Sequence, residues 1–181
     1  MILVLVDPQR GFFDPVNLAA KLRDLLDLRL FRAVVATKFV NTPEVPFERF
    51  SDWPGLNAAE QEICGEIAPY LDAVIAKSGF NAAIQPVLHA LQEFNGGRKP
   101  KAVLLAGTDT EACILASAMG FFEQGIRPFI LVDYCASHNG LHVHNAGLMC
   151  LEYAIGSKNL LRGDPATFAA QVKTLIDGEC L

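Results

Sequence analysis

Short continuous runs of apolar residues recur along the chain, separated by longer stretches in which apolar residues repeat every three or four positions. Continuous apolar runs are typical of strands that are covered on both faces. They predict strands at residues 2–6, 33–37, 73–76, 102–106 and 129–132, with a weaker one near 157–161. The three-to-four spacing predicts helices over residues 17–30, 58–70, 84–95, 112–125, 142–155 and 165–177.

The alternation of strands and helices predicts the fold class. Parallel strands need a crossover between them, and a helix supplies it. We therefore expect one α/β domain over residues 1–181, with three α/β/α layers and a mostly parallel, Rossmann-like sheet of six strands. The length of 181 residues suits one domain of this kind.

One segment breaks the alternation. Residues 38–57, KFVNTPEVPFERFSDWPGLN, contain three prolines and several aromatic rings, and they show no clear period. Loops of this length inside a compact domain are usually functional. We predict a long loop here that forms a lid or a pocket wall.

Composition narrows the classes of partner and the compartment. Hydrophobic residues make up 51% of the chain, and 15 Lys+Arg stand against 20 Asp+Glu, for a net charge of −5. Without a basic run the chain offers nothing to a phosphate backbone, and no apolar stretch is long enough to span a bilayer. Five widely spaced cysteines without a CxxC pair suit reduced thiols. We expect a cytoplasmic protein that binds neither nucleic acid nor membrane.

Three reactive side chains lie where ligands bind in open α/β sheets, at the carboxyl ends of strands. Asp7 follows ILVLV, Lys77 follows AVIA, and Cys113 begins the helix after AVLLA and the turn GTDTEA. A helix N-terminus and a nearby ammonium group both lower the pKa of a thiol, which favours the nucleophilic thiolate. A carboxylate at the same place can accept the thiol proton and pass it on to a leaving amine.

Each of these residues also has an ordinary structural interpretation. An Asp after a strand often caps a turn, a Lys at a strand end is often solvated, and a Cys in an apolar helix often belongs to the core. Their joint placement at one sheet edge favours the catalytic interpretation.

The same residues carry a resemblance to a known family. VDPQRGF at residues 6–12, Lys77 after the third strand and AGTDTEAC at 106–113 resemble the isochorismatase-like cysteine hydrolases, which include nicotinamidases and N-carbamoylsarcosine amidases. The resemblance implies Asp7 as general base, Lys77 as thiolate stabiliser and Cys113 as nucleophile. It also implies a cis peptide between Thr108 and Asp109, and an oxyanion hole made by the backbone N–H groups of Asp109 and Cys113.

The chain departs from the family at the metal site. Nicotinamidases resemble one another in an Asp-x-His motif after the second strand, where this chain has Phe39 and Asn41. We therefore expect no zinc or iron site and no cofactor, and nicotinamide is a doubtful substrate. Together with Phe12 and Phe80, these two residues are expected to line the pocket for a small-molecule substrate.

Three histidines lie in ASHNGLHVHNAG, at His138, His142 and His144. Clustered histidines can bind a metal, but residues two apart on a helix point to different faces. We prefer a helix cap or a pocket wall for them. Cys64, Cys135, Cys150 and Cys180 are expected to be structural, and by analogy with the family the chain is expected to form a homo-oligomer.

Two functions remain open at this point. The first is a metal-independent cysteine hydrolase of a small amide, ureido or carbamoyl compound, acting through a covalent acyl-enzyme. The second is a catalytically idle small-molecule-binding protein with the same fold. A nucleotide-binding protein is disfavoured, because the first turn, DPQRGF, has neither GxGxxG nor the Walker A glycines.

Overall fold

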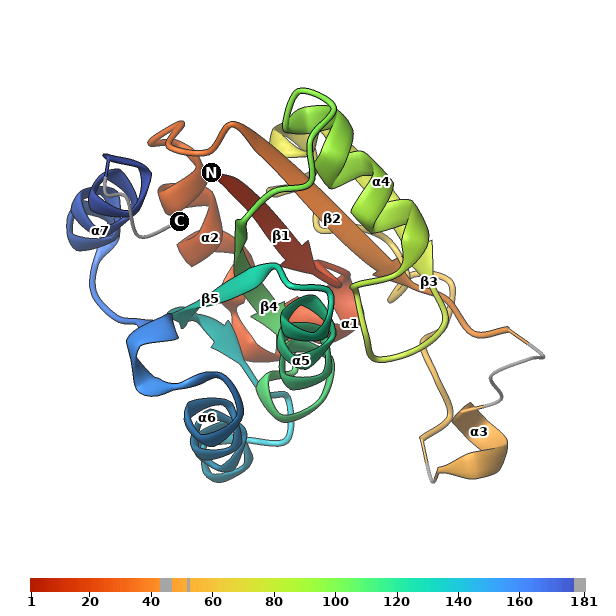
Figure 1. Cartoon of the computed structure of the whole chain (residues 1–181). Helices are drawn as coiled ribbons and strands as arrows, with labels where there is room; N and C mark the ends of the chain where they lie inside the picture. The colour runs from red at the N-terminus through yellow and green to blue at the C-terminus, as the bar shows by residue number, and fades with distance from the viewer. Residues whose placement is uncertain (43–46, 52, 178–181) are drawn as a thin grey trace.

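A computed structural model describes residues 1–42, 47–51 and 53–177 of the chain. Within them, six parallel strands form one sheet in the order β3-β2-β1-β4-β5-β6 (Figure 1). The strands are β1 (Ile2–Val6), β2 (Ala33–Phe39), β3 (Ala73–Lys77), β4 (Ala102–Thr108), β5 (Arg127–Ala136) and β6 (Leu160–Leu161). The α/β fold with a parallel six-stranded sheet, predicted from the apolar runs, is confirmed.

Helices cover both faces of the sheet. One face packs against α4 (Gln85–Phe94), α5 (Leu115–Glu123) and α6 (Leu141–Ile155), and the other against α1 (Arg10–Phe13), α2 (Leu18–Leu26) and α7 (Pro165–Asp177). In Figure 1, α2 and α7 lie together on one side, and α5 and α6 on the other. These are the three layers expected from a doubly wound chain.

The central strand β1 shows why its sequence has no polar alternation. Val4 and Val6 belong to the core on the α4–α6 side, while Leu3 and Leu5 belong to the core on the α2 side. All five residues of β1 are buried. A strand that is covered on both faces favours apolar side chains at every position.

The order of the strands indicates where a ligand should bind. The order in which strands are added to the sheet changes direction at β1: β2 and β3 follow on one side, and β4 to β6 follow on the other. In such sheets ligands bind outside the carboxyl ends of the strands at this switch point. Asp7 follows β1, and the turn before Cys113 follows β4, so both stand at this point.

One predicted helix is absent. Residues 58–70 form turns and a short 3₁₀ helix, η2 (Ala68–Tyr70), in place of the α-helix that their spacing predicted. Their backbone groups bond to the first loop instead: Arg10 N–H donates to Glu62 O at 2.9 Å, and Cys64 N–H donates to Pro8 O at 2.9 Å. Because these partners belong to another segment, the local helical period did not decide the structure.

The segment at residues 38–57 is mostly irregular after β2 ends, with one helical turn at α3 (Phe47–Phe50). The predicted loop also includes residues 43–46 and 52, which lie outside the described residues, as does Cys180. Two further short elements, η1 (Asp14–Val16) and η4 (Ser157–Asn159), precede α2 and β6.

The described helices are short. The longest, α6, has 15 residues, and none of the described helices has the length and apolar character needed to cross a membrane.

Candidate active site

Asp7, Lys77 and Cys113 come together at the carboxyl edge of the sheet. Lys77 Nζ lies 2.7 Å from Asp7 Oδ2 and 3.6 Å from Cys113 Sγ. All three residues are buried, and the side chains of Lys77 and Asp7 are 1% and 0% exposed. A thiol, a carboxylate and an ammonium group are therefore in mutual contact in a dry environment, where charges act strongly on one another.

Asp7 is held by its backbone and by a neighbouring strand. Its φ is +52°, a left-handed conformation that directs the chain sharply away from β1. Thr37, a buried residue on β2, accepts a hydrogen bond from Asp7 N–H at 3.1 Å and donates one to Asp7 Oδ1 at 2.7 Å. With Oδ1 bound to Thr37, Oδ2 is the oxygen that faces Lys77.

Lys77 is the last residue of β3, the strand at one edge of the sheet. Its ammonium group also donates to Gly79 O at 2.7 Å and lies 5.7 Å from the centre of the Phe39 ring. These contacts compensate for the water that a buried ammonium group loses. They hold Nζ between the carboxylate and the thiol.

Cys113 lies in a π-helical turn, η3 (Thr110–Ile114), that leads into α5. Ile114 N–H donates to Asp109 O at 3.0 Å, a bond that spans five residues. Such turns are rare and often occur at functional sites. Helix α6 packs tightly against the turn at Gly147, where a Cβ would lie 2.7 Å from Glu111 Cα.

The pKa of the Cys113 thiol is raised in the structure, whereas the sequence predicted a lowered pKa. Burial and the nearby Asp7 carboxylate raise the pKa of Cys113, whereas the Lys77 ammonium opposes them and lowers it. Asp7 also hydrogen-bonds to the thiol, which stabilises its protonated form. The resting group is therefore a neutral thiol beside a charged Asp7–Lys77 pair. The helix N-terminus and the lysine, which lower the pKa of the thiol, are visible in the sequence, whereas burial is a property of the packed molecule.

The turn between β4 and Cys113 contains the peptide bond that the resemblance singled out. The bond between Thr108 and Asp109 is cis in the structure. Gly107, just before it, has a φ of +126°, and a Cβ there would lie 2.2 Å from Val6 O. Only glycine permits so close an approach of β4 to β1.

Aromatic side chains pack beside the three residues. Phe39 contacts Phe12, Phe47 and Trp53 at centroid distances of 6.3, 5.1 and 5.3 Å. Two of the four predicted pocket residues, Phe12 and Phe39, are buried in this cluster at 7% and 3% exposure. A pocket of about 530 Å³ opens next to Phe12 and Trp53 and is also lined by His138.

The other two predicted pocket residues occupy the margin of the cluster. Phe80 is 49% exposed and meets only the edge of the cluster, with its ring 5.1 Å from that of Phe47. Asn41 is partly buried, and its Oδ1 has no hydrogen-bond partner among the residues that the structure describes.

The three histidines separate in space. His138 lines the pocket and contacts Asp109, while His144 Nδ1 lies 2.8 Å from Thr110 Oγ1 in the turn before Cys113. His142 is exposed. Burial lowers the pKa of His144, so the proton is lost more readily than from a free histidine.

Two residues near the site had no role in the sequence analysis. Thr37 is the polar residue that ends the apolar run AVVAT, and a polar residue within a buried strand was the signal that could have identified it. Gln9, fully buried, accepts from Phe39 N–H at 2.6 Å and donates to Phe39 O at 2.9 Å, which fixes the end of β2. No local pattern marks Gln9, because its partners lie 30 residues away.

One of the two positions at which this chain departs from the nicotinamidase metal motif is Phe39. Phe39 has no ligand atom, and its ring packs among other rings. Across the described ranges, no group of three or more His, Cys, Asp or Glu side chains is arranged to hold a metal ion.

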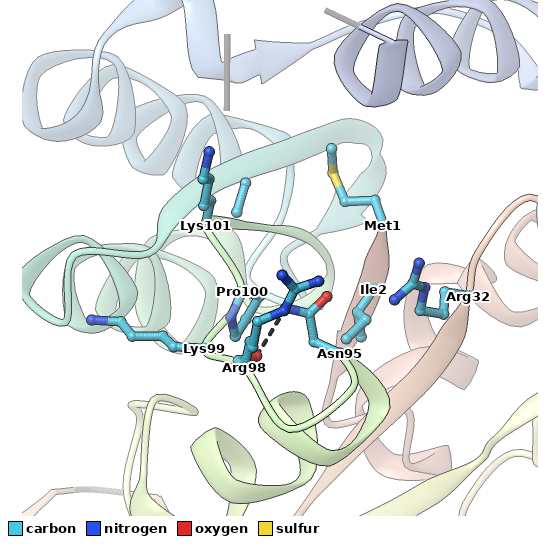
Figure 2. Close-up of a pocket in the computed structure, with 9 residues that line it drawn as sticks. Met1, Ile2, Arg32, Asn95, Arg98, Lys99, Pro100 and Lys101 are labelled. Carbon is cyan, nitrogen blue, oxygen red and sulfur yellow. Dashed lines mark hydrogen bonds between the residues drawn. The ribbon is translucent and has the colours of Figure 1, made fainter. Parts of the chain in front are cut away.

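A second pocket, of about 350 Å³, lies at the amino ends of the strands, opposite the carboxyl ends that carry the candidate site (Figure 2). Ile2 at the start of β1 and Lys101, just before β4, line it together with Arg32 and Arg98. None of the candidate site residues lines it. The chemistry of the carboxyl edge is therefore separate from this basic pocket.

Comparison with known proteins supports the resemblance. The family described as Isochorismatase domain matches residues 1–157 of the chain. Isochorismatase domain-containing protein 2 of Bos taurus is 35% identical over 48 residues, which are 26% of this chain and 24% of that protein. The match thus spans about a quarter of the relative's length.

Solved structures share the fold at low identity. An isochorismatase-like hydrolase from Alkaliphilus metalliredigens has a TM-score of 0.74 at 14% identity, covering 94% of this chain and 97% of that one. The nicotinamidase PncA from Bacillus subtilis has a TM-score of 0.68 at 17% identity, covering 90% and 98%. With the family match over residues 1–157 and the three residues at the sheet edge, the chain belongs to the isochorismatase domain family, a family of hydrolases.

Proposed function

We propose that this chain is a cysteine hydrolase that cleaves a small amide, ureido or carbamoyl compound without a metal ion. The observation that carries the proposal is the contact of Lys77 Nζ with both Asp7 Oδ2, at 2.7 Å, and Cys113 Sγ, at 3.6 Å. Burial of an ammonium group is costly, so the placement of this one between a carboxylate and a thiol favours a catalytic role.

The first half of the reaction forms an acyl-enzyme. As the substrate carbonyl approaches, the Cys113 thiol gives its proton to the Asp7 carboxylate, and the sulfur attacks the carbonyl carbon. The C–S bond forms, and the carbonyl electrons move to the oxygen, which the N–H groups of Asp109 and Cys113 stabilise. The intermediate then collapses, the C–N bond breaks, and the leaving nitrogen takes the proton from Asp7.

Water completes the cycle. It loses a proton to Asp7 and attacks the thioester carbon, the C–S bond breaks, and the sulfur recovers the proton from Asp7. Throughout, the Lys77 ammonium lies beside the sulfur and offsets its negative charge. This sequence explains why a thiol with a raised pKa still suits the role, because its base is in contact with it.

The pocket supports a small, flat substrate. Phe12 and Trp53, which line the pocket, stack at 5.9 Å with an interplanar angle of 29°. Rings bind planar groups well. This suits the planar amide, ureido and carbamoyl groups.

A screen of small amides, ureas and carbamoyl compounds with detection of released ammonia tests the proposal. We expect release with at least one of them and none with Cys113→Ala. Substantial turnover in Cys113→Ala would refute the mechanism. Wild-type protein that binds members of the screen without turning any over would instead support the alternative, an idle binding protein of the same fold.

We also propose that the chain forms a homo-oligomer through α5 and α6. Four large apolar side chains on these helices are exposed, namely Met119 (44%), Phe122 (58%), Met149 (72%) and Tyr153 (94%). They border an apolar groove of about 620 Å³. Sedimentation velocity of the wild type and of Phe122→Lys tests this, with a smaller species expected for the variant.

A reducing compartment such as the cytoplasm fits the thiols. Cys64, Cys113, Cys135 and Cys150 are all free in the structure. A nucleophilic cysteine keeps its function only where it is not oxidised.

A further inference from the structure

Asp109 places a carboxylate next to the proposed oxyanion hole. It follows the cis bond, its backbone N–H is a proposed oxyanion donor, and its side chain is a carboxylate with only 7% of the residue exposed. A negative charge beside an oxyanion hole opposes the charge that develops there. Some other group must therefore offset this carboxylate.

His138 contacts the Asp109 carboxylate through two of its atoms. The backbone N–H of His138 donates to Asp109 Oδ1 at 3.0 Å, and its ring Nδ1 lies 2.5 Å from Oδ2. A carboxylate can only accept, so Nδ1 carries the proton of this short, charge-assisted contact. Both carboxylate oxygens are thus occupied by one residue.

The loop that carries His138 also hydrogen-bonds to Glu111, in the turn that follows Asp109. Ser137 Oγ donates to Glu111 Oε1 at 2.7 Å, and Asn139 Nδ2 donates to the same oxygen at 3.2 Å. The loop between β5 and α6 therefore holds the Asp109–Glu111 turn from outside. On its other side the His138 ring lies 6.2 Å from that of Phe12, in the pocket wall.

Electrostatics agree with this geometry. Burial, followed by the charge of Glu111, raises the pKa of the Asp109 carboxyl, and the hydrogen bonds and charge of His138 offset part of this rise. Without His138, this carboxyl would be a buried group whose Oδ2 had lost its donor. Such a group moves towards water or takes up a proton, and either change disturbs the adjoining peptide.

We propose that His138 is a positioning residue for the oxyanion hole: by holding and offsetting the Asp109 carboxylate, it fixes the Asp109 N–H toward the reacting carbonyl. The inference rests on the proposed function. It assigns His138 no direct proton transfer, and it gives a role to one of the three histidines for which a pocket wall or a helix cap was expected.

An aldehyde separates this role from the reactivity of the thiol. Benzaldehyde adds to a cysteine thiol, forming a C–S bond and a tetrahedral carbon whose oxygen occupies the oxyanion hole, while the thiol proton goes to that oxygen or to Asp7. Iodoacetamide alkylates the same sulfur without forming an oxyanion. The dissociation constant of benzaldehyde is read from its protection of Cys113 against alkylation, measured by peptide mass spectrometry.

We expect His138→Ala to weaken benzaldehyde binding about tenfold, the scale of a lost charge-assisted hydrogen bond. The alkylation rate without the aldehyde should change far less, because Asp109 acts on the thiol less strongly than burial, Asp7 and Lys77 do. His142→Ala, at an exposed histidine of the same motif, is the matched control and should bind benzaldehyde as the wild type does. His138→Asn keeps a donor near the position of Nδ1 and should recover part of the loss.

Equal benzaldehyde affinity in His138→Ala and the wild type would overturn this inference while leaving the proposed function intact. A wild-type Cys113 that benzaldehyde does not protect would also overturn this inference, because no oxyanion hole then stabilises the adduct, while the ammonia-release screen decides the proposed function separately.

Discussion

The contact between Lys77 and Cys113 gives a quantitative prediction for the thiolate population of Cys113. Two unit charges 3.6 Å apart, the distance from Nζ to Sγ, attract by about 4.6 kcal/mol at an effective dielectric constant of about 20. Each factor of ten in thiolate population is worth about 1.4 kcal/mol. Removal of the ammonium group should therefore reduce the thiolate population by more than tenfold.

The net effect is smaller than the pair energy for a structural reason. Asp7, which opposes the thiolate, has Lys77 as its own partner at 2.7 Å. In the variant this buried carboxylate loses its counter-charge and takes up a proton, which removes part of its opposition to the thiolate. We therefore expect a shift of at least about one pH unit, and not the full value of about three that the pair energy alone would give.

Alkylation by iodoacetamide measures this shift. Because Cys113 is a neutral thiol at rest, its alkylation rate near pH 8 is proportional to its small thiolate fraction. Lys77→Met should slow the reaction at Cys113 at least about tenfold, and Lys77→Arg should recover part of the rate without full catalysis. Peptide mass spectrometry separates Cys113 from the exposed Cys150.

Two controls make the result decisive. Lys158→Met removes an exposed lysine that is not one of the charged groups shifting the pKa of Cys113, and it should leave the rate unchanged. Circular dichroism verifies that Lys77→Met is folded, since it leaves the Asp7 carboxylate buried without its partner. A folded Lys77→Met that alkylates at the wild-type rate would refute the assignment of Lys77 to the site.

Three further predictions follow from the site. Asp7→Asn should reduce kcat by several orders of magnitude because an amide cannot carry the proton, and near wild-type kcat would reduce Asp7 to a structural role. Exhaustive EDTA treatment should leave activity unchanged, since Phe39 carries no ligand atom, and loss that zinc, iron or manganese restores would contradict this. Gly147→Ala should lower kcat, because the new Cβ would meet Glu111 Cα at 2.7 Å and displace the turn that carries Cys113. Gly65→Ala is its control, since a Cβ there meets nothing within 4 Å, and equal kcat values would show that the turn tolerates the displacement.

The sequence alone determined the fold and the edge at which the chemistry lies. Apolar runs such as 2–6 are continuous because both faces of the strand are buried, and this local property is visible without coordinates. In parallel strands the residues after each run share one edge, so Asp7, Lys77 and Cys113 were expected at one place.

Tertiary structure decided what depends on partners distant in the chain. Residues 58–70 have helical spacing, but their backbone groups bond to residues 8–11, and no helix forms. The pKa of Cys113 is raised because burial and Asp7 act against Lys77, and burial is a property of the packed molecule. Thr37 hydrogen-bonds to Asp7 across 30 residues, and His138 to Asp109 across 29 residues. These bonds likewise form only when the strands are side by side. Local patterns record which side chains are apolar, whereas the direction and strength of a contact between two polar groups depend on their positions in three dimensions.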